Sequence, residues 1–371
     1  MKILLVTHYT LPHRGGIEVV VDKLSHYLSL KGYRVCVLSS QAGAQPVEKR
    51  DGLTIFRIRA CNILERFGVP YPIFSPELIG YLSRLVAWAD IVHCHGFLQM
   101  SSLIALLIAK RRKKYSVLTE HAGLVPYRSF FWKSVEQGAV KSIGRAAIRL
   151  ADWVTVVSHS VALDLQKVEP LRTVEIIPNG VDVDLFKPLC MEEKEELRRR
   201  LGWDSRPKVL YVGSNKPRKR VPLLLAAADP AFDLVLCGAA MASAAGTRSG
   251  CLVYENAPAE LVADLLAASD LFVLPSASEG FPLSPMEAIA SGLPVILTTD
   301  LRGLDIAKSA FVRIVKPHPD QIRQVIKDGL DDEQWHAWVR REGWEWVRRN
   351  YSWDAAVDRY ISLYEDVLAA R

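Results

Sequence analysis

The sequence predicts an α/β protein built from two Rossmann-like, doubly wound domains that face each other across a cleft. Strand-like apolar runs alternate with helical patterns along most of the chain, which favours parallel sheets covered by helices. The alternation lapses once, just before residue 186, and resumes after residue 204. The length of 371 residues also exceeds one ordinary domain of about 100 to 200 residues.

The first half contains a series of candidate strands separated by helical patterns. The run at residues 2–7 is continuously apolar, as expected of a strand buried on both faces of a parallel sheet. The other candidates are 34–39, 54–59, 90–95, 116–121, 153–158 and 175–177. We assign residues 1–185 to an N-terminal domain.

The charged run at 191–200 follows Pro188, so we place a linker at 186–204 and a C-terminal domain at 205–352. Its candidate strands are 208–213, 233–237, 251–254, 271–274, 294–297 and 312–315. Residues 353–371 form an amphipathic helical pattern, which predicts a helix that packs back on the N-terminal domain. Ligands of such sheets bind at the carboxyl ends of the strands.

The composition predicts a soluble, cytoplasmic protein. The amino terminus passes directly into a strand-like run without a signal-peptide cleavage site. The longest apolar helical run, 103–109, is far shorter than the roughly 20 residues of a membrane span. The six cysteines form no C-x-x-C pair, and we expect them to be reduced core residues.

The net charge of +6 is uneven, because residues 1–185 carry +8 and the remainder carries −2. Residues 110–150 alone carry +8. The run consists of Lys110, Arg111, Arg112, Lys113 and Lys114, and is followed by Lys133, by a stripe at 141, 145 and 149, and by aromatic residues at 130–132. No nucleic-acid module accompanies this basic patch, so we favour docking on an anionic membrane surface, at the inner face of the cell membrane.

The stretch 276–295 is the strongest candidate site. Two carboxylates, Glu279 and Glu287, flank a turn between a buried strand and a short helix. A helix start favours an anion, and carboxylates accept hydrogen bonds from hydroxyls, so a sugar nucleotide suits both. Glu287 also has a structural interpretation, because Ser284 and Glu287 match a capping box. Glu279 has no comparable structural role.

Other candidates follow strand ends. Gly15 and Gly16 precede a helix and allow a phosphate to approach the backbone, or simply make a tight turn. His121 ends a strand, where a histidine is either functional or structural. The basic turn with Lys216, Lys219 and Arg220 is within reach of a diphosphate or is a solvated loop. The absence of G-x-G-x-x-G and of a P-loop counts against a dehydrogenase or an NTPase.

Two patterns resemble metal sites but have simpler interpretations. In a strand, His93 and His95 share one face while Cys94 points to the other, and no further ligand lies nearby in sequence. We interpret the two histidines as a wall of the cleft. Asp182 and Asp184 form a D-x-D pattern that we interpret as part of a turn. We predict no metal site.

Several motifs together resemble the retaining glycosyltransferases of family 4, which have the GT-B fold. They are the Gly-Gly-Ile-Glu loop at 15–18, Thr-Glu-His at 119–121, Pro-Asn-Gly-Val-Asp at 178–182, the strand ending at Gly213, and the E-x7-E stretch with its Ser-Gly-Leu-Pro-Val-Ile exit at 291–296. The resemblance extends over most of the chain. It implies a nucleotide-sugar site in the C-terminal domain and an acceptor side in the N-terminal domain.

The resemblance also implies roles for individual residues. Glu279 would contact the transferred sugar, Glu287 the ribose, and His121 would lie near the sugar. Lys219 would bind phosphate, and the expected catalytic set is His121, Glu279 and Lys219. The remaining donor-binding residues would be Gly15, Gly16, Ser214, Lys216, Arg218, Gly280, Phe281, Pro282 and Leu283. Ser214 stands where the family has an arginine, so either Lys216 or Arg218 compensates or donor binding differs.

The expected reaction moves a hexosyl group from a nucleotide diphosphosugar to a hydroxyl of a glycan, glycolipid or lipid-linked sugar, without a metal or other cofactor. An epimerase or phosphorylase of the same fold and a non-catalytic sugar-nucleotide-binding protein are the alternatives. The two glutamates also invite a glycosidase-like acid and base interpretation, but we expect them to bind the donor.

Overall fold

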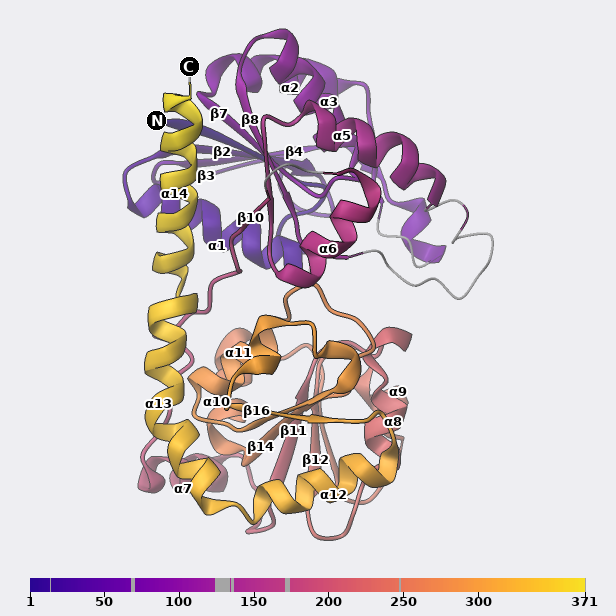
Figure 1. Ribbon diagram of the computed structural model, residues 1–371, viewed down its shortest axis with the longest axis vertical. Coiled ribbons are helices and arrows are strands. Elements are labelled where there is room, and N and C mark those ends of the chain that lie inside the picture. The colour runs from indigo at the N-terminus through magenta and orange to yellow at the C-terminus, as the bar shows by residue number, and fades with distance from the viewer. Residues whose placement is uncertain are drawn as a thin grey trace. The chain divides into compact units, whose positions relative to one another are not determined.

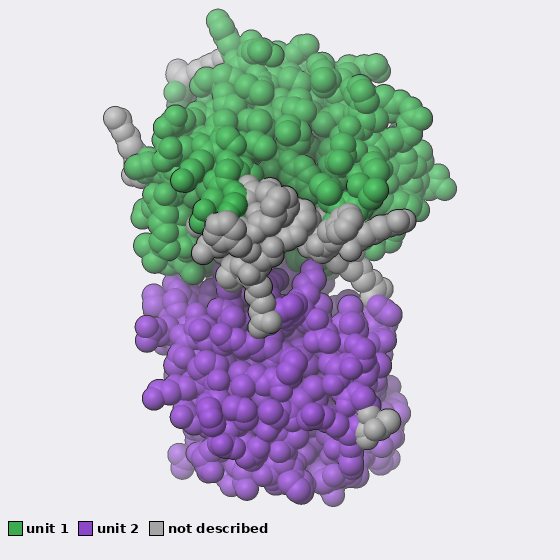
Figure 2. Space-filling model, turned by 90° about the vertical axis from the view of Figure 1, so that its right-hand side faces the viewer, with its two compact units in different colours: residues 1–180, 356–371 green, residues 181–355 purple. Residues whose placement is uncertain are grey.

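The computed structural model describes residues 1–13, 15–67, 71–123, 134, 137–170, 174–246 and 248–370. The chain forms two compact units, which Figure 2 colours separately: unit 1 comprises residues 1–180 and 356–371, and unit 2 comprises residues 181–355. Each unit is a mainly parallel sheet with helices on its faces (Figure 1), so the predicted fold of two Rossmann-like domains is confirmed.

Unit 1 contains an eight-stranded sheet in the order β10-β9-β8-β7-β1-β2-β4-β3. β1 lies inside the sheet, where Leu4 pairs with Cys36 and Val92, and its apolar residues are buried as predicted. Only β3 is antiparallel to its neighbour. The bounds are Lys2–Val6 (β1), Arg34–Ser40 (β2), Val47–Arg50 (β3), Leu53–Ile58 (β4), Ile91–His95 (β7), Tyr115–Glu120 (β8), Trp153–Val156 (β9) and Glu175–Ile176 (β10). Strand β3 and a separate two-stranded antiparallel sheet, Ala60–Cys61 (β5) with Ile73–Phe74 (β6), were not predicted from the sequence.

The helices of unit 1 connect these strands and return at the end of the chain. The described helices are Gly16–Leu30 (α1), Ile63–Phe67 (η1), Glu77–Trp88 (α2), Met100–Arg111 (α3), Val140–Gly144 (η2), Arg145–Leu150 (α5), His159–Val168 (α6) and Trp353–Ala369 (α14). Tyr364 of α14 is fully buried, and its hydroxyl lies 2.6 Å from His93 Nδ1. The predicted return of the C-terminal helix to the first domain is therefore confirmed.

Unit 2 contains a six-stranded parallel sheet in the order β13-β12-β11-β14-β15-β16. Its strands are Lys208–Val212 (β11), Asp233–Cys237 (β12), Cys251–Tyr254 (β13), Leu271–Leu274 (β14), Val295–Thr298 (β15) and Val312–Val315 (β16). Its helices are Met191–Arg200 (α7), Pro217–Lys219 (η3), Val221–Ala226 (α8), Met241–Ala245 (α9), Ala259–Ala268 (α10), Leu283–Ala290 (α11), Thr299–Leu301 (η4), Asp305–Lys308 (η5), Pro319–Leu330 (α12) and Glu333–Tyr351 (α13).

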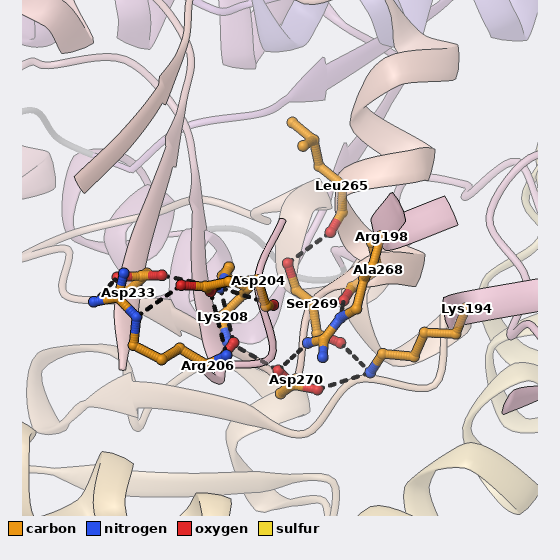
Figure 3. Close-up of polar contacts among 10 residues, drawn as sticks. All are labelled: Lys194, Arg198, Asp204, Arg206, Lys208, Asp233, Leu265, Ala268, Ser269 and Asp270. Atoms are coloured by element: carbon orange, nitrogen blue, oxygen red, sulfur yellow. Dashed lines mark hydrogen bonds and ion pairs between the residues drawn. The ribbon is translucent and has the colours of Figure 1, made fainter. Parts of the chain in front are cut away.

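Paired charges fasten the edge of unit 2 where the strands begin (Figure 3). The Lys208 side chain is 1% exposed, and its ammonium lies 2.9 Å from Asp233 Oδ2. Asp270, which precedes β14, accepts hydrogen bonds from the Lys208 backbone at 2.8 Å and from Lys194 of α7 at 2.9 Å, and it also pairs with Arg198. Residues 186–204, which the sequence analysis assigns to a linker, thus lie within unit 2, where α7 is fastened to the sheet edge.

Helix α11 is placed by close backbone packing against α13. A Cβ atom added to Gly343 would lie 2.5 Å from the carbonyl oxygen of Ile289, so only glycine permits this approach. The long α13 therefore supports the helix that carries Glu287.

All six cysteines are free. Cys36, Cys94 and Cys237 are buried as predicted, whereas Cys61 and Cys190 are exposed, so the prediction of core thiols is wrong for these two. Cys190 instead caps α7, since its Sγ accepts a hydrogen bond from the Glu193 backbone. In the described part of the chain no helix combines the length and apolar character needed to cross a membrane.

Candidate functional site

The central feature of unit 2 is a buried carboxylate held by two cations. Glu279 lies in the loop between β14 and α11, and its side chain is 6% exposed. Its Oε1 lies 2.6 Å from Lys219 Nζ, and its Oε2 lies 2.9 Å from Arg218 Nη1. Because β11 and β14 are neighbours in the sheet, the loops that follow them meet, and the Ala277 backbone donates to the Arg218 carbonyl at 2.8 Å.

The electrostatics of this cluster keep Glu279 ionised. Burial alone would raise the pKa of Glu279, but the charges of Lys219 and Arg218 outweigh it, so the pKa is lowered. Burial lowers the pKa of Lys219, and the attraction of Glu279 opposes this. Two cations around one carboxylate leave a surplus positive charge at the carboxyl edge of the sheet, which suits an anion.

The other residues predicted around the basic turn lie in different positions. Ser214 directs its carbonyl oxygen to the Tyr211 hydroxyl at 3.1 Å. Lys216 is exposed. Arg220 has a left-handed backbone with a φ of 52°. Its side chain pairs with Asp300 at 2.7 Å and so does not contact Glu279. Arg218 is the residue that joins Lys219 at Glu279.

Glu287 does not form the predicted capping box. Helix α11 starts at Leu283, no side chain caps it, and Ser284 Oγ instead donates to the Val212 carbonyl at 3.2 Å. The capping interpretation is therefore wrong, because the N-cap is Pro282 and the helix begins two residues earlier than the box requires. Glu287 is half-buried, and burial together with the charge of Asp182 raises its pKa to about 7.

The turn between the two glutamates is held by apolar packing. Phe281 lies with its ring centroid 5.9 Å from that of Tyr351, and Pro282 is buried. Gly280 and Leu283 complete the turn into α11. These side chains shape the turn, and the donor contacts predicted for residues 280–283 would come from its backbone.

In unit 1, polar residues gather where β7 and β8 end. His121 is 8% exposed, and its Nε2 lies 2.8 Å from His95 Nδ1. Burial lowers the pKa of His121 to about 4, so its imidazole is neutral. His93 and His95 have no exposed surface, so the prediction that they form a cleft wall is wrong; they lie beneath His121.

Glu120 is a residue that sequence reasoning missed. Its carboxylate accepts backbone hydrogen bonds from Phe97 at 2.9 Å, His121 at 3.1 Å and Ala122 at 2.9 Å. Burial nevertheless raises its pKa to about 7, since no cation is among the causes of its shift. An acidic residue at the end of a buried strand, with no basic residue near it in sequence, was the available signal.

The two glycines at the start of α1 differ in their surroundings. A Cβ atom on Gly15 would lie 2.3 Å from Glu18 Oε2, so a larger residue there would displace the end of the Glu18 side chain. Glu18 in turn contacts His13 Nδ1 at 2.8 Å. A Cβ atom on Gly16 would meet no atom within 4 Å, so space lies beside the helix start.

The basic patch lies at the opposite edge of the sheet from His121. Residues 110–114 end α3 and immediately precede β8, whereas His121 follows it, and six strand residues span about 20 Å. Four of the five are exposed, and Lys114 donates to the Ala89 carbonyl at 2.7 Å. The stripe is neutralised in part, since Arg145 and Arg149 both contact Glu169. Residues 130–133 lie outside the described residues.

Neither metal-like pattern gathers ligands. In the part of the chain that the structure describes, no group of three or more His, Cys, Asp or Glu residues could hold a metal ion. Asp182 Oδ1 accepts a hydrogen bond from the Leu185 backbone at 3.2 Å, in agreement with the predicted turn.

Comparison with known families gives two consecutive matches. Residues 14–185 match Glycosyltransferase Family 4, and residues 193–343 match Glycosyl transferases group 1. The first corresponds nearly to the amino-terminal part of unit 1, and the second lies within unit 2.

Individual relatives agree with these matches. The chain is 30% identical over 316 residues to the putative teichuronic acid biosynthesis glycosyltransferase TuaC of Bacillus subtilis, covering 82% of this chain and 78% of that protein. It resembles sucrose-phosphate synthase of Thermosynechococcus elongatus with a TM-score of 0.79 at 20% identity over 100% of both chains. It also resembles Anabaena HepE, solved with UDP-glucose, with a TM-score of 0.76 at 16% identity over 99% of this chain and 100% of that one. The two structural matches show the fold.

Proposed function

Since the chain belongs to the family 4 glycosyltransferases of the GT-B fold, we propose that it moves a hexosyl group from a nucleotide diphosphosugar to an acceptor hydroxyl with retention of configuration. No metal takes part in the proposed reaction. Glu279, Lys219, Arg218 and Glu287 bind the donor, and His121 lies near the sugar that is transferred.

The observation that carries this proposal is the pairing of Glu279 with Lys219 and Arg218. The leaving diphosphate gains negative charge as the glycosidic bond breaks, and fixed cations at that position lower the barrier. Lys219 supplies a point charge to a phosphate, and Arg218 supplies a planar guanidinium that can bind two phosphate oxygens. Arg218 would thus take the role of the family's arginine, where this chain has Ser214. When the diphosphate binds, these cations contact it while they still flank Glu279, which stays ionised and accepts hydrogen bonds from sugar hydroxyls.

Retention is supported by the state of Glu279. A carboxylate whose pKa is lowered by two cations is a weak base, whereas inversion needs a general base that activates the acceptor. Glu287 has the opposite property, a raised pKa, and accepts hydrogen bonds from the ribose hydroxyls once it is ionised. Neither glutamate then acts as a glycosidase-like acid or base.

The donor class is supported by relatives of the same fold, since HepE has been solved with UDP-glucose. TuaC is named for teichuronic acid biosynthesis, which supports a glycan acceptor. We also propose glycolipid or lipid-linked sugar acceptors and a cytoplasmic location. We expect the C-terminal domain, unit 2, to bind the donor and unit 1 to bind the acceptor.

The test is a set of turnover assays with UDP-, GDP- and ADP-sugars, in which released nucleotide and the anomeric configuration of the product are measured. We expect Glu279→Gln to reduce turnover by about 100-fold while nucleotide still raises the melting temperature. The control, Glu195→Gln, alters an exposed carboxylate of α7 and should keep full activity.

Several outcomes would contradict this proposal. An inverted product would refute retention. Conversion of the donor without any acceptor would indicate an epimerase, and consumption of phosphate would indicate a phosphorylase. Equal activity of wild type and Glu279→Gln would refute the role of Glu279, and binding without turnover for every donor and acceptor pair would support a non-catalytic sugar-nucleotide-binding protein.

We also propose that the basic patch at 110–114 docks on an anionic membrane surface. The cations at 110–113 are exposed at the end of α3, away from the carboxyl edge of the sheet, so they would hold the protein without contacting the sugar. Neutralising these four residues should abolish sedimentation with phosphatidylglycerol vesicles at low salt. The membrane-docking proposal would be refuted if the variant sedimented as well as wild type, or if wild type sedimented equally well with neutral vesicles.

A further inference from the structure

A column of three histidines runs beneath the end of β8 in unit 1. The ring centroids of His93 and His95 are 4.2 Å apart, and those of His95 and His121 are 5.1 Å apart with the rings nearly parallel. His93 contacts Tyr364 through Nδ1 and Thr119 through Nε2, at 2.6 and 2.7 Å. The column is therefore anchored at its lower end in the core, and His121 is its upper end.

Each imidazole in the column is neutral and carries one N–H group. Burial lowers the pKa of His95 well below its ordinary value and lowers that of His121 to about 4. The 2.8 Å contact between His95 Nδ1 and His121 Nε2 can then contain only one proton. Whichever nitrogen donates fixes the tautomer of both rings.

Asn179 indicates which nitrogen donates. Its side chain acts on His121 in the direction that raises the pKa of the histidine, as a hydrogen-bond acceptor does. Among the described residues, His121 Nδ1 and Asn179 Oδ1 are both buried and neither has a partner at hydrogen-bond geometry, so each is the partner available to the other. If His121 carries its proton on Nδ1, its Nε2 is an acceptor, and His95 Nδ1 must be the donor.

We propose that His95 is a positioning residue that holds His121 in a single tautomer and orientation for glycosyl transfer. This proposal rests on the proposed function, because it gives the ring a task in that reaction. His95 Nδ1 donates to His121 Nε2 from below, and Asn179 Oδ1 is the acceptor available to Nδ1. The His121 ring would then contact the sugar in one fixed orientation. The His121 backbone N–H donates to the Glu120 carboxylate, which also holds the main chain in place.

The wild-type protein gives the first test. Imidazole nitrogen NMR of the ¹⁵N-histidine-labelled chain, assigned with His121→Gln, should show His121 protonated on Nδ1 and not on Nε2. Protonation on Nε2 would overturn the proposal without any variant. This readout needs no turnover, so it stands even if the donor and acceptor assigned above are wrong.

Variants at residue 95 give the second test. His95→Leu removes the donor, and we expect a mixture of His121 tautomers and a kcat about tenfold lower, the equivalent of one lost hydrogen bond. His95→Asn keeps an N–H group near the Nδ1 position and should restore the wild-type tautomer and most of kcat.

A packing control lies on the same strand. Cys94 is also fully buried but points to the opposite face, where its Sγ contacts the Ser102 carbonyl. Cys94→Ala should lower stability and leave the His121 tautomer and kcat unchanged. A His95→Leu protein with the wild-type tautomer and kcat would refute the positioning role, as would a loss of kcat of equal size in Cys94→Ala.

Discussion

Glu287→Gln should make unit 2 more stable while weakening donor binding. The carboxyl of Glu287 has a pKa of about 7 in the folded protein, compared with an ordinary value of 4.5. No described residue forms an ion pair with it, and the negative charge of Asp182 adds to the effect of burial on its pKa. Glutamine has almost the same volume but carries no charge that burial must desolvate.

The sign and magnitude follow from proton linkage. Because the folded pKa is raised, the stabilising contribution of this group is fully present below pH 4.5 and is lost as the pH rises through 7. One pKa unit corresponds to about 1.4 kcal/mol, which sets an upper limit of about 3 kcal/mol at pH 8.5. Partial exposure of the side chain reduces this to about 2 kcal/mol.

The assay is urea unfolding of wild type and variant at pH 5 and pH 8.5, followed by tryptophan fluorescence. Six of the nine tryptophans lie in unit 2, so the signal reports mainly on that unit. We expect nearly equal stability at pH 5 and a gain of about 2 kcal/mol for Glu287→Gln at pH 8.5. Glu195→Gln, at an exposed position, should show no such pH-dependent gain.

Donor binding should change in the opposite direction. Hydrogen bonds to a charged group contribute about 1.5 to 3 kcal/mol, so the KM for the donor should rise by roughly 10- to 100-fold. A variant that is equally stable or less stable than wild type at pH 8.5 would refute the reasoning, because it would show that the carboxylate is not destabilising. An unchanged KM would separately refute the ribose role.

Two further predictions concern packing and charge in unit 2. Lys208→Met removes a cation whose side chain is 1% exposed and takes one partner from Asp233. We expect the free energy of unfolding in urea to fall by about 3 to 5 kcal/mol. The double variant Lys208→Met with Asp233→Asn should recover part of this loss. Equal loss in the single and double variants would contradict this. Gly238→Ala places a Cβ atom 1.7 Å from a backbone oxygen at a φ of 141°. The control Gly80→Ala, with open space around it, should gain roughly 1 kcal/mol of stability, and Gly238→Ala should lose several times that amount. A Gly238→Ala protein as stable as wild type would show that the backbone relaxes.

The strands were predictable because parallel β-strands leave a strong signal. Runs such as 271–274 are apolar throughout, and every predicted strand corresponds to an observed one within two residues at most of its ends. The edge strand β3, with the sequence Val-Glu-Lys-Arg, was missed because only one of its residues is apolar. Its place is set by pairing with β4, which no local pattern reveals.

The candidate site was predictable only where function leaves residues without a structural explanation. Glu279 was chosen because no structural role was visible for it, and the structure places it with Lys219. Glu287 was ambiguous because the capping box requires Ser284 to be the N-cap, whereas the observed N-cap is Pro282, and this shift of two residues decides the question. The contacts of Arg218 and Glu120 could be found only from the structure. Arg218 pairs with Glu279, which is 61 residues away in sequence, and Glu120 accepts a hydrogen bond from the Phe97 backbone in another loop.

Two carboxylates without a compensating cation lie where the strands end, although Glu279 at the same edge of unit 2 is paired with two cations. Where the strands begin, carboxylates have partners: Asp270 with Lys194 and Arg198, and Asp152 with Ser116. Where the strands end, the half-buried Glu287 and the buried Glu120 have no cation among the causes of their pKa shifts, and both pKa values are raised to about 7. Burying such groups costs stability, and folding alone offers no reason to place them there. The cost is concentrated at the edge where parallel sheets bind ligands, and this is the edge at which we propose that the donor binds.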